Sequence, residues 1–303
     1  MVAAIEVVLK ALGIGPGDEV IVPPYTFIAT ASSALLNNAV PIFADIDPET
    51  FNMSPSQAEK AITPNTRAII VVHFAGNAAD MDAFLQVAAR HNLILIEDAA
   101  HAHGASWKGR GLGSIGRAGT FSFQASKNMT AGEGGLISVN DKDLAIRCES
   151  YMWAGRDFDR PWYEHHRLGW NYRMTEFQGA ILLEQLKRIA AQNARRHQNA
   201  VYLNNRLAEI PGIRPLAQRD YATKHSHHIY IFRFDESLFG LLRSEFLAAL
   251  EGEGIPCSAG YAHPLYKNPM FLNQEFYPRG CPLTCGHYNR KIDYAPFADA
   301  CPN

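Results

Sequence analysis

Six short, almost purely apolar segments constrain the fold of this chain most. Their sequences are EVIVPP (19–24), AVPIFADI (39–46), RAIIVVHF (67–74), NLILIEDAA (92–100), GTFSFQ (119–124) and GGLISVN (134–140). Runs without polar alternation are typical of strands buried on both faces of a parallel sheet. Between two of them, DMDAFLQVAARHN has helical periodicity, with Asp80 as its predicted N-cap. This repeated order predicts an α/β fold with a mostly parallel sheet.

The second half of the chain predicts a long helix followed by a smaller domain. Thr175 and Gln178 have the spacing of a capping box, and no proline follows until Pro211. Beyond it, HHIYIFRF (227–234) has the composition of a strand and SEFLAALEGEG (244–254) that of a helix. We therefore expect an α+β C-terminal domain. The predicted boundaries are a large domain at 1–175, a connecting helix at 176–210 and an incomplete small domain at 211–303.

Composition excludes several classes of function. The formal net charge is −2 and no long basic run occurs, so nucleic acid is not an expected partner. No apolar stretch reaches the roughly 18 residues that a membrane helix needs, and Glu6 and Lys10 interrupt the only candidate signal peptide. Five scattered cysteines without a CxxC pair indicate reduced thiols and a cytoplasmic location. A metal site at Cys281 and Cys285 stays an open alternative, although no second ligand pair has fitting spacing.

Lys127 is the most informative charged residue. It lies in FSFQASKNMTAGEGG (121–135), between an apolar run and a glycine cluster. A lysine in a partly desolvated cleft loses proton affinity and becomes a nucleophile. Pyridoxal phosphate chemistry needs such an amine, a carboxylate for the ring nitrogen and anion-binding groups for the phosphate. Asp98, at the end of an apolar strand, and Ser122 are candidates for the last two roles, which the pattern permits but does not require.

Other patterns leave alternatives open. Glu97 and Asp98 are adjacent in a strand and face opposite sides, so we expect only one of them in a given site. A helix cap plus a surface acid explains the pair equally well. GLGSIG (111–116) matches a dinucleotide fingerprint but lacks the strand before it and the helix after it, which favours a surface loop. His225 and His227 could share a strand face and bind metal, or be structural.

Four motifs together resemble one family. They are GIGPGDEVIVPPYTF, EDAAHAHGA, GTFSFQASKNMTAGEGG and GWNYRMTEFQGA. They resemble the DegT/DnrJ/EryC1/StrS aminotransferases, which are fold-type I pyridoxal phosphate enzymes, and the similarity runs from about Ile5 to the C-terminus. The residues of the second and third motifs resemble the branch of the family that makes 3-amino-5-hydroxybenzoate or aminates cyclitol ketones.

The resemblance implies roles for particular residues. Lys127 matches the lysine that forms the Schiff base, Asp98 the partner of the pyridine nitrogen, and His101 a residue beside the ring oxygen. Further cofactor contacts are implied for Ser122, Phe27, Asn171 and the backbone near Ala3. Phe27 would stack on the ring, although core packing is the alternative. Asn171 would reach the phosphate of the neighbouring subunit, which implies a homodimer with shared active sites.

The activity implied is transamination from glutamate or glutamine to a keto-sugar or cyclic ketone, with pyridoxamine 5′-phosphate as the intermediate cofactor form. A sugar dehydrase branch carries histidine instead of the lysine, so Lys127 argues against it. A catalytically impaired fragment is the other alternative, because relatives carry a Gly-Thr or Gly-Ser pair where Met1 and Val2 stand and continue beyond the final CPN. The sequence does not decide the two substrates, nor the roles of Arg173, Glu133 and the cluster His225–His228.

Overall fold

A six-stranded sheet forms the centre of the protein. The computed structural model describes residues 1–277, 279–284 and 286–303. The strand order is β2 (Val40–Phe43), β1 (Glu19–Val22), β3 (Thr66–Val72), β4 (Ile94–Asp98), β7 (Ala118–Ser122) and β8 (Gly135–Ser138). The first five strands are parallel, and β8 alone runs antiparallel, beside β7. Each predicted apolar segment contributes one strand, and the predicted α/β class with a mostly parallel sheet is confirmed.

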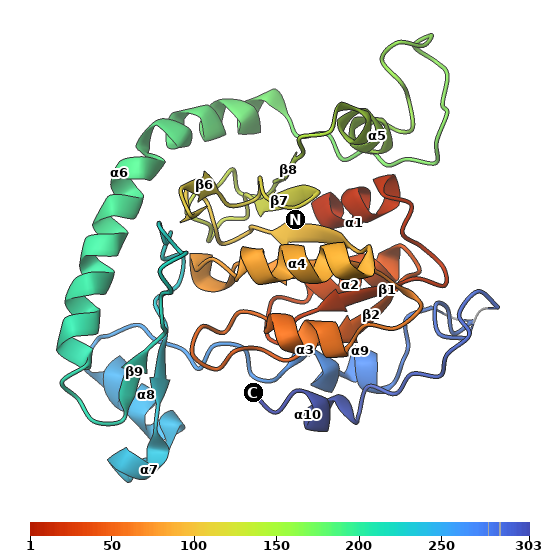
Figure 1. Cartoon of the computed structure of the whole chain (residues 1–303). Helices are drawn as coiled ribbons and strands as arrows, with labels where there is room; N and C mark the ends of the chain where they lie inside the picture. The colour runs from red at the N-terminus through yellow and green to blue at the C-terminus, as the bar shows by residue number, and fades with distance from the viewer. Residues whose placement is uncertain (278, 285) are drawn as a thin grey trace.

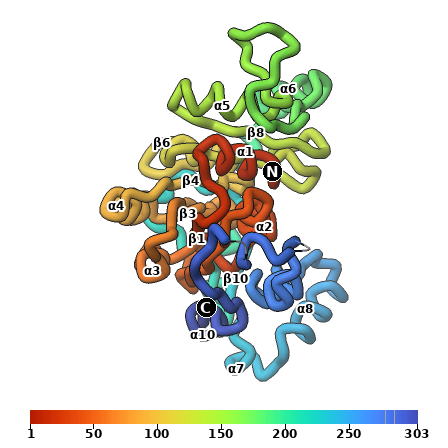
Figure 2. Tube along the Cα trace, turned by 90° about the vertical axis from the view of Figure 1, so that its right-hand side faces the viewer, coloured from red at the N-terminus to blue at the C-terminus, as the bar shows by residue number. Residues whose placement is uncertain are grey.

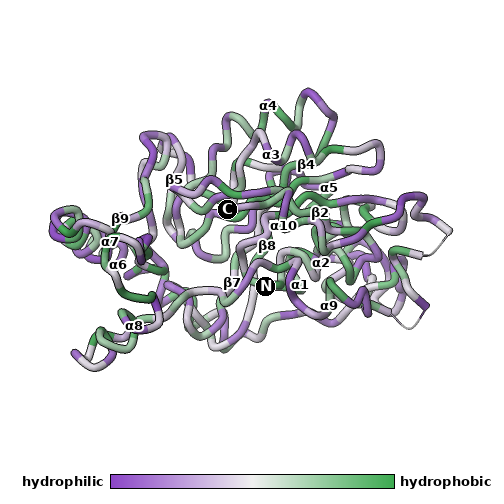
Figure 3. The backbone as a smooth tube through the Cα atoms, turned by 90° about the horizontal axis from the view of Figure 1, so that it is seen from below, coloured by the Kyte–Doolittle hydropathy of each residue, from purple (hydrophilic) through white to green (hydrophobic). Residues whose placement is uncertain are grey.

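Helices cover both faces of this sheet. The helical elements of this part are α1 (Val2–Ala11), α2 (Ala29–Leu36), α3 (Pro55–Lys60), η1 (Phe74–Gly76), α4 (Met81–His91) and α5 (Lys142–Met152). One layer pairs α3 with α4, and the other pairs α1 with α2 and α5 (Figure 2). The strands between them belong to one continuous buried cluster, and Figure 3 shows apolar chain concentrated there. A short hairpin, β5 (Ser106–Trp107) and β6 (Arg110–Gly111), follows β4.

The predicted connecting helix is α6 (Glu176–Leu207), which begins with the expected capping box. It runs along the side of the molecule from the sheet to a small unit (Figure 1). This unit contains β9 (Ile213–Pro215), β10 (Phe232–Phe234), α7 (Glu236–Phe239) and α8 (Arg243–Gly252). The predicted strand at 227–234 is wrong over its first half, because only Phe232–Phe234 pair with β9. The preceding residues bind the loops of the large domain instead: the backbone of His228 donates to Ala75 O at 2.9 Å.

The last part of the chain returns to the sheet. It contains η2 (Leu265–Lys267), α9 (Pro269–Leu272) and α10 (Phe297–Ala300), which lie beside β2 in Figure 1. Phe43 of β2 meets the rings of Phe271 and Tyr294 at centroid distances of 5.2 and 5.8 Å. This part of the predicted small domain therefore packs on the large domain, while the domain boundaries themselves stay a prediction. None of the helices described is both long and apolar enough to cross a bilayer.

Candidate active site

The carboxyl ends of two neighbouring strands bring the predicted chemical groups together. Asp98 is the last residue of β4 and Ser122 the last residue of β7, and these strands are paired in parallel. Lys127 follows in the turn after β7, where its backbone N–H donates to Gln124 O at 2.9 Å. Parallel strands end at the same edge of a sheet, which is where open α/β sheets bind ligands. The fold thus explains why a lysine stands where the chain leaves a buried strand.

Asp98 is buried and fixed in orientation. Only 1% of its surface is exposed. The Thr30 hydroxyl donates to its Oδ2 at 2.8 Å, and the Ala100 N–H donates to its Oδ1 at 3.2 Å. Burial raises the pKa of Asp98 above its ordinary value, and the two hydrogen bonds and the Lys127 charge offset part of that rise. A buried carboxylate in this state favours a cationic partner, because a nearby positive charge restores its ionised form.

Lys127 and Asp98 are close enough to influence each other. Burial lowers the pKa of the Lys127 amine below its ordinary value, and the negative charge of Asp98 offsets part of this effect. An amine with lowered pKa is more often neutral at physiological pH, and only the neutral amine is a nucleophile or a base. The structure therefore places an amine and a carboxylate of opposite charge near the same edge of the sheet.

His101 is a buried, neutral imidazole. Its Nδ1 accepts a hydrogen bond from the backbone N–H of Ala75 at 3.2 Å, so the ring proton lies on Nε2. Burial, followed by the charges of Lys127 and His228, holds the pKa of His101 well below its usual value. The ring can accordingly offer an N–H donor without carrying a charge.

Three other predicted cofactor contacts, Ser122, Ala3 and Phe27, end, follow or flank strands of the same sheet. The buried Ser122 hydroxyl receives the N–H of Gln124 at 3.4 Å. Ala3 lies in the first turn of α1, against β8: a Cβ on Gly135 would lie 3.5 Å from the Cβ of the neighbouring Ala4. Phe27 is 53% exposed, so its alternative role in core packing is wrong. An exposed ring remains free to meet a ligand.

Asn171 lies in a different setting. It is exposed, its Oδ1 accepts from Arg173 Nε at 2.8 Å, and its backbone forms an isolated bridge with Trp153. The Arg173 guanidinium lies 5.9 Å from the Trp153 ring centroid. The segment therefore presents the side chain of Asn171 to solvent.

The other strand-end acid, Glu97, faces away from this site. Its Oε1 accepts from the backbone N–H groups of Ile115 and Gly116 at 2.6 and 2.7 Å, and its Oε2 accepts from Gly113 at 2.8 Å. His73 Nε2 donates to the same Oε2 at 2.9 Å. Burial would raise the pKa of Glu97, but the hydrogen bond and charge of His73 and the loop amides outweigh it and lower the pKa. The glycine-rich loop at 111–116 thus binds an internal carboxylate.

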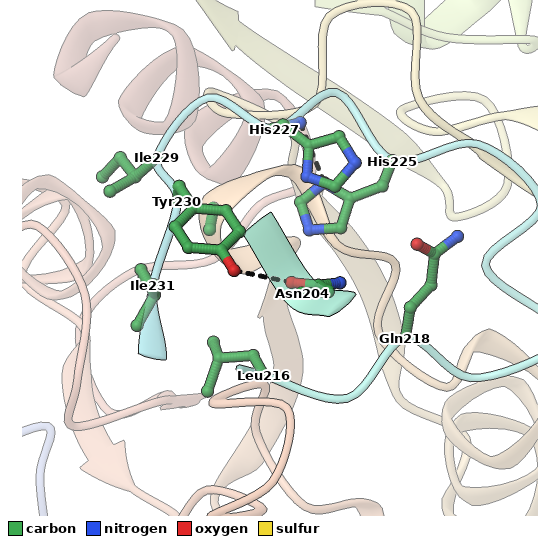
Figure 4. A pocket seen from close by; sticks show the side chains of 9 residues that line it. Asn204, Leu216, Gln218, His225, His227, Ile229, Tyr230 and Ile231 are labelled. Atoms are coloured by element: carbon green, nitrogen blue, oxygen red, sulfur yellow. Dashed lines mark hydrogen bonds between the residues drawn. The ribbon is translucent and has the colours of Figure 1, made fainter. Parts of the chain in front are cut away.

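The side chains of His225 and His227 contact each other. Their rings stack at 3.9 Å, and His225 Nδ1 accepts from the backbone of His227 at 2.9 Å. Figure 4 shows both rings at the edge of a small pocket that Asn204 and Tyr230 also line. Within residues 1–277, 279–284 and 286–303, no group of three or more His, Cys, Asp and Glu is arranged to hold a metal ion. The proposed pair with Cys281 involves Cys285, which lies outside the described residues.

Sequence reasoning missed three residues near the site. Thr30 holds Asp98, and the ring of His228 lies 4.4 Å from that of His101. Tyr261 comes from the small domain: burial raises its pKa to about 12, and the charge of Asp98 adds to this rise. Thr30 and Tyr261 belong to no motif with a chemical signature, and His228 stood out only as a member of the His225–His228 cluster, so only the fold reveals their place near the site.

Comparison with known proteins identifies the class. The fold is that of solved fold-type I aminotransferases. A crystal structure of 3-amino-5-hydroxybenzoic acid synthase superposes with a TM-score of 0.88 and 34% identity, covering 99% of this chain and 75% of that one. NtdA from Bacillus subtilis, solved with bound cofactor PMP, superposes with a TM-score of 0.80 and 30% sequence identity. The match covers 90% of this chain and 62% of that one.

Residues 2–297 match the model of the DegT/DnrJ/EryC1/StrS aminotransferase family, and the chain belongs to that family. A putative L-glutamine:3-amino-2,3-dideoxy-scyllo-inosose aminotransferase of Streptoalloteichus tenebrarius is 41% identical over 282 residues, which are 91% of this chain and 67% of the relative. This chain covers 65% of the length of each of two further relatives that have the same description. The aminotransferases of this family depend on pyridoxal phosphate. The predicted family and enzyme class are therefore confirmed.

Proposed function

We propose that this chain is a pyridoxal-phosphate-dependent aminotransferase that moves an amino group from glutamine or glutamate to a cyclic ketone or keto-sugar. The observation that carries the proposal is that the partly buried Lys127 amine, in the turn after β7, and the buried Asp98 carboxylate, at the end of β4, lie near enough for each charge to shift the pKa of the other. A desolvated amine and a desolvated acid fit the cofactor's aldehyde and ring nitrogen, and the buried Ser122 hydroxyl fits its phosphate.

Each side chain has a distinct task in this proposal. The bound cofactor supplies an electron sink for breaking a bond to hydrogen at the substrate carbon. Asp98 would face the ring nitrogen and hold a proton there, with Thr30 fixing the direction of its oxygens. Lys127 would hold the cofactor and, once released, carry a proton as a neutral base. His101 would donate from Nε2, and Phe27 would cover one face of the ring.

The keto substrate is best supported as an aminocyclitol-type ketone, because the relative named above acts on a scyllo-inosose derivative by its description. The structural similarity to 3-amino-5-hydroxybenzoic acid synthase supports a second candidate, an aminated ring precursor of that type. Both are six-membered rings that carry hydroxyl groups.

A homodimer with shared active sites is part of the proposal. Asn171 is exposed on its own protomer, next to an outward-facing stretch of α6 in which Phe177 is 85% exposed. Mixing Lys127→Ala chains with Asn171→Ala chains should restore activity, since one hybrid site is then intact. If mixed dimers form without any recovery, the sites are not shared. Cys148, Cys257 and Cys301 form no disulfide, which supports a cytoplasmic location.

The central experiment tests Lys127 directly. The protein loaded with pyridoxal phosphate should absorb as a Schiff base, and borohydride reduction followed by peptide mapping should label Lys127. Lys108→Ala is the matched control, because that lysine pairs with Asp82 at the surface. Lys127→Ala should lose the label, and product formation from a panel of cyclic ketones with glutamine or glutamate should be read by mass. A label on another lysine would contradict the assignment.

A further inference from the structure

A short segment of the predicted small domain, Ser226–His228, packs against loops of the candidate active site. The Ser226 hydroxyl donates to His101 O at 2.6 Å, and the Ser226 backbone donates to Gly76 O at 3.3 Å. The packing is tight, because a Cβ on Gly76 would lie 1.9 Å from Ser226 Oγ. Ser226–His228 therefore joins loops that lie far apart in the sequence.

His228 makes three contacts with these loops. Its backbone N–H donates to Ala75 O at 2.9 Å, and Ala75 N–H in turn donates to His101 Nδ1 at 3.2 Å. Its ring lies 4.4 Å from the His101 ring with an interplanar angle of 39°. Its Nδ1 lies 3.2 Å from the Oδ1 of Asn128, the residue that directly follows Lys127.

The direction of the last hydrogen bond can be assigned. Asn128 Nδ2 donates to Ser226 O at 2.8 Å and to Asn193 Oδ1 at 3.4 Å, so the other amide atom is the oxygen. His228 must then donate from Nδ1, which leaves Nε2 without a proton. Burial, followed by the Lys127 charge, lowers the pKa of His228 to about 3, so the ring is neutral at physiological pH.

We propose that His228 is a positioning residue for the reaction, which holds Lys127 through Asn128 and the ring plane of His101 through direct contact. This inference rests on the proposed function of the same site. A substitution that keeps an aromatic ring but lacks Nδ1 removes the hydrogen bond alone. A substitution that removes the ring removes both the hydrogen bond and the ring contact. Loss of either should misplace groups that act on the cofactor, while substrate contacts are left in place.

Two substitutions and a control separate these effects. His228→Phe keeps a ring beside His101 but removes the bond to Asn128, and His228→Ala removes both. The control is His227→Asn, because His227 has φ +44° and asparagine tolerates that backbone region. Its ring contacts His197 and His225 rather than the residues around Lys127.

We expect kcat to fall about tenfold in His228→Phe, the effect of one lost hydrogen bond, and further in His228→Ala. KM for the keto substrate should change less than threefold. The pH at which the cofactor absorption band titrates should shift in both variants by about half a unit or more. His227→Asn should match the wild type in all three measurements.

A double variant tests the route through Asn128. Asn128→Ala combined with His228→Phe should be no slower than the slower single variant, because both remove the same hydrogen bond. The proposal would be overturned if the losses in kcat of the two single variants multiplied in the double variant. It would also be overturned if only KM changed, if the pH at which the cofactor absorption band titrates did not shift, or if His227→Asn lost as much activity as the His228 variants. The proposed function itself fails if the wild type shows no cofactor absorption band that Lys127→Ala abolishes. This result differs from a failure of the positioning role of His228, in which the band is present but the variants behave like the wild type.

Discussion

The hydrogen bond between Thr30 and Asp98 offers a sharp test of how the site keeps its carboxylate ionised. Thr30 Oγ1 donates to Asp98 Oδ2 at 2.8 Å, and both residues are buried. Thr30→Val replaces the hydroxyl by a methyl group of nearly the same volume, so the helix packing is preserved. A hydrogen bond to a charged group contributes roughly 1.5–3 kcal/mol. At about 1.4 kcal/mol per pKa unit, its loss should raise the pKa of Asp98 by about one to two units.

The sign of the effect on cofactor binding follows directly. Asp98 must be ionised to pair with a protonated ring nitrogen, so affinity falls as pH drops through the pKa of Asp98. A higher pKa moves this fall to higher pH. Calorimetric titration with pyridoxamine phosphate from about pH 5 to 9 should therefore show the acid limb of the affinity profile shifted upward by about one to two units in Thr30→Val.

Thr30→Ser is the matched control, because serine keeps the hydroxyl. Its profile should follow that of the wild type, and circular dichroism should show all three proteins folded at each pH. Coincident acid limbs for the valine and serine variants would refute the assigned role of Thr30. A parallel loss of affinity at every pH would mean that the residue acts through packing rather than through the charge of Asp98.

Three further predictions concern the same region. Burial and the Lys127 charge lower the pKa of His103 from 6.5 to about 4. The contribution of His103 to the free energy of unfolding is therefore fully present above pH 6.5, and up to about 3 kcal/mol is lost as the pH falls towards 4. Urea unfolding at pH 7 and 4.5 should show a smaller loss in His103→Phe than in the wild type. Gly116→Ala should lower the urea midpoint, because its Cβ would lie 2.7 Å from a strand carbonyl, whereas Gly111→Ala, with open space around it, should not. Asp98→Ala should reduce kcat by several orders of magnitude while Asp98→Glu keeps part of it, and near-normal turnover in the alanine variant would assign the role to another acid.

The sequence was sufficient for the sheet and for the centre of the site. Continuous apolar runs identify buried parallel strands, and the end of one strand places Asp98 at the edge where ligands bind. Lys127 stood out because its setting, between a strand and a glycine turn, is unusual for a surface lysine. The alternation of side chains along a strand also separated Asp98 from Glu97, which face different surroundings in the structure.

The supporting residues could not be predicted in the same way. Thr30 meets Asp98 across 68 positions of sequence, and His228 meets Asn128 across 100. Neither contact leaves a periodic or spacing signal, because each depends on how separate loops converge. The same cause explains the misassigned start of the strand at 227–234. The composition of the segment indicated a strand, but backbone hydrogen bonding to the loop at Ala75 took precedence.

The carboxylate of Glu97 has a consequence for how the chain folds. It joins β4 to the loop before β7 across only 16 to 19 positions of sequence. Closing a loop of this length costs less chain entropy than the β1–β3 pairing, whose partners lie 47 or 48 positions apart. We therefore expect β4, this loop and β7 to form before β1 pairs with β3. The two strand ends that carry Asp98 and Ser122 would then be aligned early.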